Sequence, residues 1–199
     1  MDQIEFDNEF FDLDPNDLWV YNKLQVSRML GYVCGPVGVK VHKPDNYIVR
    51  PSINFLGLGM GARFTYIQDT TDHLTPGHFW CEIFKGRHYS VDYEHGKRVR
   101  TTEGIRGDSL TKWKRWEIVK KDFPFPSFLY EFRDKPHVNC EFIGNKLIEV
   151  HIRNNPDFSY NNTVFIPVWE GDVIDSPVGH TFIDCPDIHG RIGAYIDIT

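Results

Sequence analysis

Short runs of alternating apolar and polar residues dominate the chain, and this pattern predicts a protein built mainly of β-strands. The predicted strands cover residues 47–51, 64–67, 79–84, 88–93, 97–101, 164–166 and 194–196. Glycines and prolines lie between these runs and favour turns. A helix is predicted over residues 18–30, with Asp17 as its N-cap and Gly31 as its stop. A shorter helical pattern covers residues 127–133, whereas residues 103–109 are predicted to form a loop.

One predicted hairpin carries charged side chains where a packing strand would carry Val, Ile or Leu. Glu141 lies on one short apolar strand and Glu149 on the next, and the Gly-Asn pair at 144–145 between them favours a tight turn. Because alternate residues of a strand face the same side, Glu149, His151 and Arg153 are predicted to share a face. Two carboxylates beside an arginine suit a magnesium–phosphate site. A surface hairpin with solvated acids, or a simple pair of Arg153 with Glu149, is the plainer alternative.

The length and composition limit the kinds of protein that the chain can be. With 199 residues it can form one large domain or two small subdomains, and 41% hydrophobic residues predict a globular fold. No apolar run approaches a membrane span and no signal-peptide pattern opens the chain, so we expect a cytoplasmic protein without membrane contact. The net charge of -6 argues against a general nucleic-acid binder. The four cysteines are widely spaced, which favours reduced thiols.

One basic cluster stands out against the acidic character of the chain, and Trp113 and Trp116 lie within it. The cluster consists of Lys112, Lys114, Arg115, Lys120 and Lys121. Basic residues beside aromatic rings can bind single-stranded nucleic acid or anionic substrates. A solvated strand with its tryptophans turned inward is the interpretation that we favour.

Alternating glycines follow the predicted strand that ends in Arg50 and a proline. Gly57, Gly59 and Gly61 would allow backbone amides to approach a ligand closely, as in phosphate-binding loops. The spacing matches neither the Walker loop nor the dinucleotide-binding fingerprint. Because glycines also serve ordinary turns, this stretch alone is weak evidence.

Taken in order along residues 18–158, these motifs resemble the ATP-grasp family. The matching pieces are an Asn-Lys pair that opens a helix, the strand ending in a basic residue and proline, the glycine stretch, the segment 81–91 and the hairpin acids. The segment 81–91 is similar to the family's adenine hinge, and the hairpin is similar to its acid, then Glu-x-Asn-x-Arg, metal signature.

The resemblance implies a role for each matching residue. Lys23 and Arg50 would contact the ATP phosphates, and the glycine stretch would form the flap over them. Glu82 and Phe84 would meet the adenine, and His88 the ribose.

The resemblance also implies that the hairpin residues hold the metal and assist catalysis. Glu141, Glu149 and His151 would bind Mg²⁺, and Arg153 would act with Lys23 in catalysis. The cofactors implied are ATP and Mg²⁺, or Mn²⁺.

Three residues depart from the family's pattern. Arg50 stands in place of lysine, and His88 in place of the acid that holds ribose. His151 stands in place of asparagine, and imidazole is a poor ligand for Mg²⁺, whereas Mn²⁺ tolerates it better. Asn154 or Asn155 could compensate, or His151 could hydrogen-bond to Glu149 without binding metal.

The fold implied is α+β and ATP-grasp-like, with two α+β subdomains of mainly antiparallel sheets and an ATP cleft between them. An acidic arm over residues 1–17, a small subdomain over 18–80 with the glycine flap, and a large subdomain over 81–199 with the metal hairpin are expected. The family usually has a preceding domain, so the resemblance is to a compact form without it.

The function implied is ATP-dependent ligation, in which a carboxylate is activated as an acylphosphate and then attacked by an amine or similar nucleophile. A catalytically inactive nucleotide-binding or structural relative, and a kinase on the same fold, are the alternatives. The acceptor, a small molecule or a protein, is not identified by the sequence. The C-terminal tail, a partner chain or a homo-oligomer could supply its site.

Overall fold

Two antiparallel β-sheets make up most of the structure, a computed structural model that describes residues 13–53, 59–107, 109–173, 175–186 and 190–198. The smaller sheet has the strand order β1-β4-β2-β3. Its strands are β1 (Cys34–Pro36), β2 (Asp45–Pro51), β3 (Arg63–Ile67) and β4 (His78–Cys81). The larger sheet has the order β11-β12-β10-β7-β6-β5-β8-β9. Its strands are β5 (His88–Glu94), β6 (Lys97–Arg106), β7 (Trp113–Ile118), β8 (Val138–Ile143), β9 (Lys146–His151), β10 (Asn162–Trp169), β11 (Thr181–Ile183) and β12 (Arg191–Ile198).

Helical segments are short, and they lie against different parts of the larger sheet. They are the 3₁₀ segments η1 (Pro15–Tyr21), η2 (Ser127–Phe132) and η3 (Pro156–Phe158) and the α-helix α2 (Lys23–Met29). Every strand pairing among the described residues is antiparallel. The predicted α+β architecture with mainly antiparallel sheets is therefore confirmed. No helix in the described ranges is long and apolar enough to cross a membrane, and all four cysteines are free thiols.

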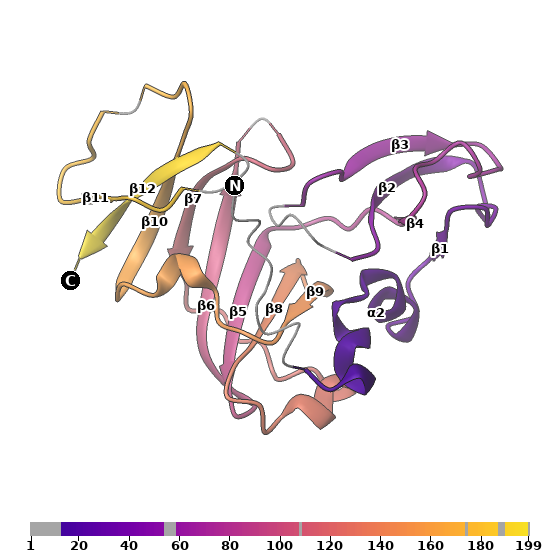
Figure 1. Ribbon diagram of the computed structural model, residues 1–199, viewed down its shortest axis with the longest axis horizontal. Coiled ribbons are helices and arrows are strands. Elements are labelled where there is room, and N and C mark those ends of the chain that lie inside the picture. The colour runs from indigo at the N-terminus through magenta and orange to yellow at the C-terminus, as the bar shows by residue number, and fades with distance from the viewer. Residues whose placement is uncertain (1–12, 54–58, 108, 174, 187–189, 199) are drawn as a thin grey trace.

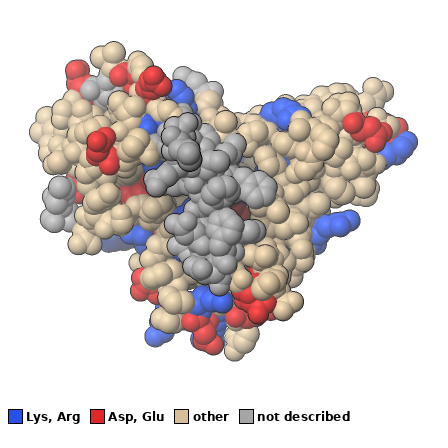
Figure 2. Space-filling view, viewed as in Figure 1, with Lys and Arg blue, Asp and Glu red and all other residues tan. Residues whose placement is uncertain are grey.

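The two sheets extend away from a common junction, with α2 lying beside it (Figure 1). Figure 2 shows them as two lobes in the space-filling view. The main core lies in the larger lobe, where Val20 of η1 and Val26 of α2 pack with Val91, Leu129 and Cys140. A separate core surrounds Trp80 in the smaller sheet, and a third lies between β7, β10 and β12.

The first predicted helix differs from the observed one because an asparagine interrupts it. Residues 15–21 form a 3₁₀ segment capped by Asp14, and α2 begins only at Lys23. Asn22 has an extended backbone and accepts a hydrogen bond from the Gln25 amide, so it caps α2. The prediction of Asp17 as the cap is wrong. Gly31 follows the helix with φ of 70°, as a stop residue requires.

The predicted loop over residues 103–109 is also wrong, because β6 continues to Arg106. Gly104, which favoured a turn in the sequence, serves instead to make room for two rings. A Cβ at this position would lie 2.7 Å from Trp113 and 2.8 Å from Trp116. Both tryptophans are buried on β7, which confirms that they turn inward beneath the basic cluster.

The segment between the sheets is fixed by a contact between two glycines. Gly86 has φ of 131°, and a Cβ there would lie 2.8 Å from the Cα of Gly144 in the β8–β9 turn. The Gly144 amide also donates a hydrogen bond to the Arg87 carbonyl at 2.8 Å. Gly86 and Arg87 are thus attached to the hairpin that carries Glu141 and Glu149.

Replacing Gly86 by alanine is expected to destabilise the protein for two reasons. The positive φ costs about 1–3 kcal/mol for a residue with a Cβ, and the backbone clash adds about 1–3 kcal/mol. Gly171 is a matched control, because it has φ of 85° and no atom within 4 Å of the Cβ position. Gly171→Ala should lose only about 1–2 kcal/mol. Urea denaturation measures both values, and equal losses would contradict the proposed glycine contact.

Candidate functional site

The two hairpin acids lie opposite each other where the two sheets meet. Glu141 of β8 and Glu149 of β9 are cross-strand partners, so their side chains project to one face. The register shifts directly after this pair, from Glu141–Glu149 to Phe142–Leu147, which leaves Ile148 as an extra residue in β9. Such a β-bulge changes the direction of neighbouring side chains. The hairpin and its pair of carboxylates, predicted from the sequence, are both present.

A buried ion pair joins Glu149 to the start of α2. Lys23 Nζ lies 2.9 Å from Glu149 Oε1, and the side chains are 4% and 9% exposed. The Lys23 amide also donates to the Ser52 carbonyl at 2.8 Å, just after β2. His151 Nε2 lies 3.4 Å from the same Glu149 oxygen. Glu149 is therefore not the solvated surface acid of the plainer alternative, and Lys23 is buried with it.

Arg50 connects the smaller sheet to the bulge in β9. Its Nη2 donates to the carbonyl of Ile148 at 3.1 Å, and its guanidinium lies 5.2 Å from the centre of the Phe79 ring. The Nε atom of Arg50 is buried and has no hydrogen-bond partner among the described residues. A buried unpaired donor costs about 1–3 kcal/mol, and the Arg50 Nε atom is available to donate to an anionic ligand.

His88 and Arg106 extend the site along the larger sheet. His88 Nε2 lies 2.9 Å from Glu141 Oε2, and its Nδ1 lies 3.1 Å from Arg106 Nη2. The His88 ring is buried with edge contacts to Trp113 and Trp116. Arg106 was not among the residues selected from the sequence, because it fell within the predicted loop. The available signal was the pair Trp113 and Trp116, which follows Arg106 on the next strand.

The predicted hinge residues lie at the edge of the smaller sheet. The Glu82 amide donates to the Val33 carbonyl, and the Val33 amide donates to Glu82 Oε1, each at 2.9 Å. The Phe84 ring packs edge-on against Tyr32 at 4.6 Å.

The glycine stretch joins β2 to β3, and the structure describes it in part. Gly59 and Gly61 have φ of 70° and 78°, and the Ala62 amide donates to the Gly59 carbonyl to close a turn. Gly57 lies outside the described residues. The flap role of these glycines remains a prediction.

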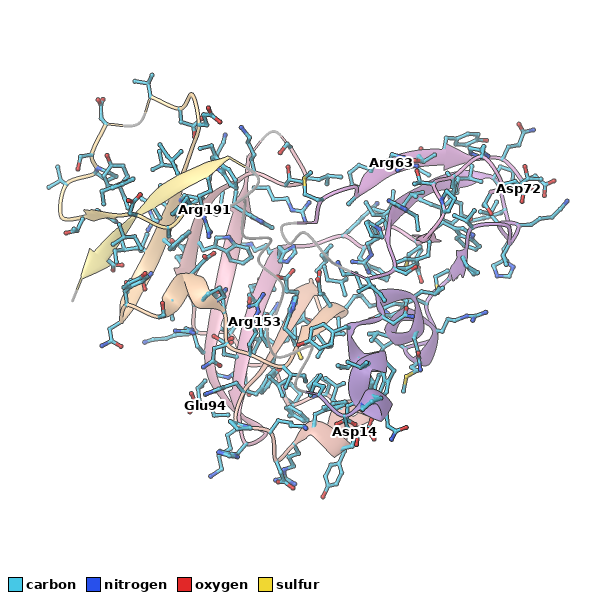
Figure 3. The ribbon with its side chains drawn as sticks, viewed as in Figure 1. Asp14, Arg63, Asp72, Glu94, Arg153 and Arg191 are labelled. Atoms are coloured by element: carbon cyan, nitrogen blue, oxygen red, sulfur yellow. The ribbon has the colours of Figure 1, made fainter. Side chains whose placement is uncertain are left out.

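Arg153 lies beyond the end of β9 and beside the larger sheet, whereas Arg63 lies on the smaller sheet (Figure 3). The strand alternation predicted for Glu149, His151 and Arg153 therefore holds only to His151. Arg153 Nη1 donates to the carbonyl of Asn154 at 3.0 Å.

Of the two asparagines that could compensate for His151, Asn155 has its side-chain oxygen engaged by the Asp157 amide, whereas Asn154 Oδ1 is buried and has no hydrogen-bond partner among the described residues. Asn154 Nδ2 lies 3.0 Å from His137 Nδ1. The Asn155 side chain donates to Ser90, and its backbone amide donates to Asp92.

The surroundings keep both hairpin carboxyls ionised. Burial opposes ionisation of Glu149, but the Lys23 charge and His151 outweigh it and hold the pKa of Glu149 well below its usual value. For Glu141, burial is likewise outweighed by the hydrogen bond from His88, so its pKa is lowered. Burial lowers the pKa of Lys23, and the Glu149 charge only partly offsets this. Burial also lowers the pKa of Arg106.

The donor set fits Mg²⁺ only with help from a ligand. Among the described residues, no group of three or more His, Cys, Asp or Glu side chains is arranged to hold a metal. Mg²⁺ is commonly bound by one or two carboxylates together with substrate phosphates and water. Glu141 and Glu149 supply two carboxylates on one face, and the Glu141 side chain is 28% exposed. His151 is placed to orient Glu149.

Solved structures of a synthetase share this architecture. N5-carboxyaminoimidazole synthetase from Staphylococcus aureus complexed with ADP matches with a TM-score of 0.57 at 10% identity, over 92% of this chain and 68% of that chain. A second structure of that synthetase gives 0.56 at 10% identity, over 90% and 67%. An ATP-grasp superfamily protein from Archaeoglobus fulgidus gives 0.49 at 13% identity, over 90% of this chain and 64% of that chain.

The synthetase likenesses show that the chain has the ATP-grasp fold, as the motif order predicted. This chain spans 64% of the length of the Archaeoglobus fulgidus protein. No protein-family model matches the sequence, and no match was found among curated protein sequences.

Replacing Glu149 by glutamine is expected to lower the free energy of unfolding by about 3–5 kcal/mol, because Lys23 is left as a buried unpaired charge. Changing Lys23 to methionine in the same protein removes that charge and should restore most of the loss. Urea denaturation of the wild type, both single variants and Glu149→Gln/Lys23→Met measures the coupling. Additive single losses would contradict a direct ion pair.

Acidification is expected to test the same pair from the carboxylate side. Because the pKa of Glu149 is lower in the folded protein than in the unfolded chain, its stabilisation is complete above the unfolded value of about 4.3 and falls as pH drops through the folded value. The stability of the wild type should therefore decline more steeply below about pH 4 than that of Glu149→Gln/Lys23→Met. Parallel profiles in thermal unfolding between neutral and acid pH would argue against this assignment.

Proposed function

We propose that the chain is an ATP-dependent ligase of the ATP-grasp type, which activates an acceptor carboxylate as an acylphosphate. The observation that carries this proposal is the opposed pair Glu141 and Glu149, placed at the junction of the sheets and surrounded by Lys23, Arg50 and Arg106. Glu141 and Glu149 would serve a metal, and Lys23 and Arg50 would serve the phosphates, while Arg106 contacts His88. The two lobes would be the two subdomains, with ATP between them.

The cations would stabilise the charge that moves during phosphoryl transfer. Arg50 has an unpaired buried Nε that could donate to a phosphate oxygen, and Lys23 could exchange its contact with Glu149 for one with phosphate. Arg153 is assigned a similar role by its motif position. Preorganised charges of this kind contribute most of the catalysis in phosphoryl transfer.

The proposed reaction has two steps. The acceptor carboxylate attacks the γ-phosphorus of ATP and releases ADP, and an amine or similar nucleophile then displaces inorganic phosphate from the acylphosphate. Glu141 and Glu149 would hold Mg²⁺ or Mn²⁺, with His151 orienting Glu149. The metal, when bound, would neutralise charge on the ATP phosphates.

The nucleotide would lie along the segment between the sheets. Glu82 and Phe84 would meet the adenine, with the glycines at 57–61 over the phosphates. His88 was predicted to contact the ribose, but both of its ring nitrogens are engaged by protein groups. The synthetase neighbour with ADP supports nucleotide binding on this fold.

Nucleotide binding without turnover is the second candidate, and one observation favours it. The Glu149 carboxylate already contacts both Lys23 and His151, so a metal must compete with those contacts. A kinase on the same fold is the third candidate.

A hydroxylamine trap distinguishes these three functions. The protein is incubated with ATP, Mg²⁺ or Mn²⁺, hydroxylamine and a panel of amino acids, peptides and other carboxylates, and hydroxamate, ADP and phosphate are measured. A ligase should form hydroxamate and phosphate in step with ADP. Phosphorylated acceptor without hydroxamate would indicate a kinase, and metal-dependent ATP binding without ADP would indicate the binding protein.

Glu141→Gln is the variant to test, because it removes a carboxylate charge while retaining its shape. We expect metal-dependent ATP affinity to fall by at least about tenfold. Glu170→Gln is the control, since Glu170 is exposed and lies after β10. Absence of ATP binding to folded wild-type protein, measured by calorimetry with either metal, would overturn the proposal.

A further inference from the structure

The hydrogen bonds around His88 define which of its nitrogens carries the proton. Arg106 can only donate hydrogen bonds, so the His88 Nδ1 atom that faces it at 3.1 Å must be the unprotonated acceptor. The other nitrogen, Nε2, faces the Glu141 carboxylate at 2.9 Å, and a carboxylate accepts. Both contacts are satisfied together only by a neutral imidazole protonated on Nε2. A proton on Nδ1 would place two donors against each other.

Packing holds the imidazole ring in this orientation. Its centroid lies 4.8 Å from that of Trp113 and 5.6 Å from that of Trp116, with interplanar angles of 77° and 89°. His88 is 6% exposed, so its ring has little access to solvent or to a ligand. Gly104, opposite His88 on β6, leaves the space into which the tryptophan rings pack.

Arg106 is held in place independently of His88. Its guanidinium lies 4.8 Å from the centre of the Trp113 ring. The pairing of β6 with β7 also shifts register directly before it, from Ile105–Arg115 to Arg106–Trp113, so that Lys114 is an extra residue. A bulge therefore stands beside Arg106, as another stands beside Glu149.

We propose that Arg106 and His88 are positioning residues that fix the direction of the Glu141 carboxylate, rather than groups that contact the nucleotide. Arg106 selects the His88 tautomer, and the tautomer directs one donor at Glu141 Oε2. The value of this arrangement to a metal site rests on the proposed function, whereas the tautomer itself does not. Groups that orient a metal ligand in this way commonly affect metal affinity by 10–100-fold.

The tautomer can be observed directly in the metal-free protein. Long-range ¹H–¹⁵N correlation spectra of histidine-labelled protein report which ring nitrogen is protonated, and the His88→Gln spectrum assigns the His88 signals. The wild type should show a single neutral tautomer with protonated Nε2. An imidazolium, or a proton on Nδ1, at neutral pH would overturn the inference.

Arg106→Met is the decisive variant, because methionine retains an apolar stem over Trp113 but donates nothing. The His88 spectrum should change to a mixture of tautomers. Arg98→Met, on the same strand, and Glu141→Gln, which keeps an acceptor oxygen, should leave the wild-type tautomer unchanged. An unchanged spectrum in folded Arg106→Met would overturn the role of Arg106. If that variant fails to fold, the wild-type and Glu141→Gln spectra still decide the tautomer.

Manganese affinity in the presence of ATP tests the consequence for the metal site. Electron paramagnetic resonance titration of Mn²⁺ should show a loss of about 10–100-fold in Arg106→Met and little change in Arg98→Met. Equal affinities in the two variants would overturn the positioning role. If wild-type protein binds neither ATP nor Mn²⁺ but shows the expected tautomer, the proposed function fails while the Arg106–His88–Glu141 arrangement stands.

Discussion

The buried ion pair between Lys23 and Glu149 is the constraint on which the arrangement of the site depends. A charge left alone in this position would cost several kcal/mol, so α2 and β9 must be docked together whenever the protein is folded. The docking also fixes the chain after β2, because the Lys23 amide bonds to the Ser52 carbonyl. The Tyr21 hydroxyl accepts from the Ile152 amide nearby. Lys23 thus joins the start of α2 to the hairpin through its side chain and to the end of β2 through its amide.

Two β-bulges lie beside polar residues of the site. The carbonyl of the extra residue Ile148 in β9 accepts a hydrogen bond from Arg50, which lies on the smaller sheet. The extra residue Lys114 in β7 lies between Arg115, which pairs with Ile105, and Trp113, which pairs with Arg106. A strictly alternating strand would send these side chains to fixed faces, whereas a bulge permits neighbouring positions to converge. The polar groups of the site are concentrated around these irregularities.

Local pattern was sufficient for much of the fold and for the acids of the site. The turn and the alternating pattern of the hairpin around Glu141 and Glu149 both lie within one short segment of sequence. The order of the motifs indicated the ATP-grasp fold. The loop assigned around Gly104 was wrong because a glycine can make room for distant rings as well as form a turn. Arg106 was missed with it. Bulges, and the partners that a buried lysine such as Lys23 acquires, depend on tertiary contacts that no local pattern records.

The attachment of Gly86 to Gly144 has a mechanical consequence. If the two lobes move apart, the hairpin carries residues 86 and 87 with it, and the chain must bend both between Cys81 and Gly86 and between α2 and β1. The same movement would stretch the Arg50–Ile148 hydrogen bond, which crosses between the lobes. Opening is therefore resisted by this hydrogen bond and by the bond from the Lys23 amide to the Ser52 carbonyl. Both contacts lie near the paired acids, so opening of the lobes and access to the acids are coupled.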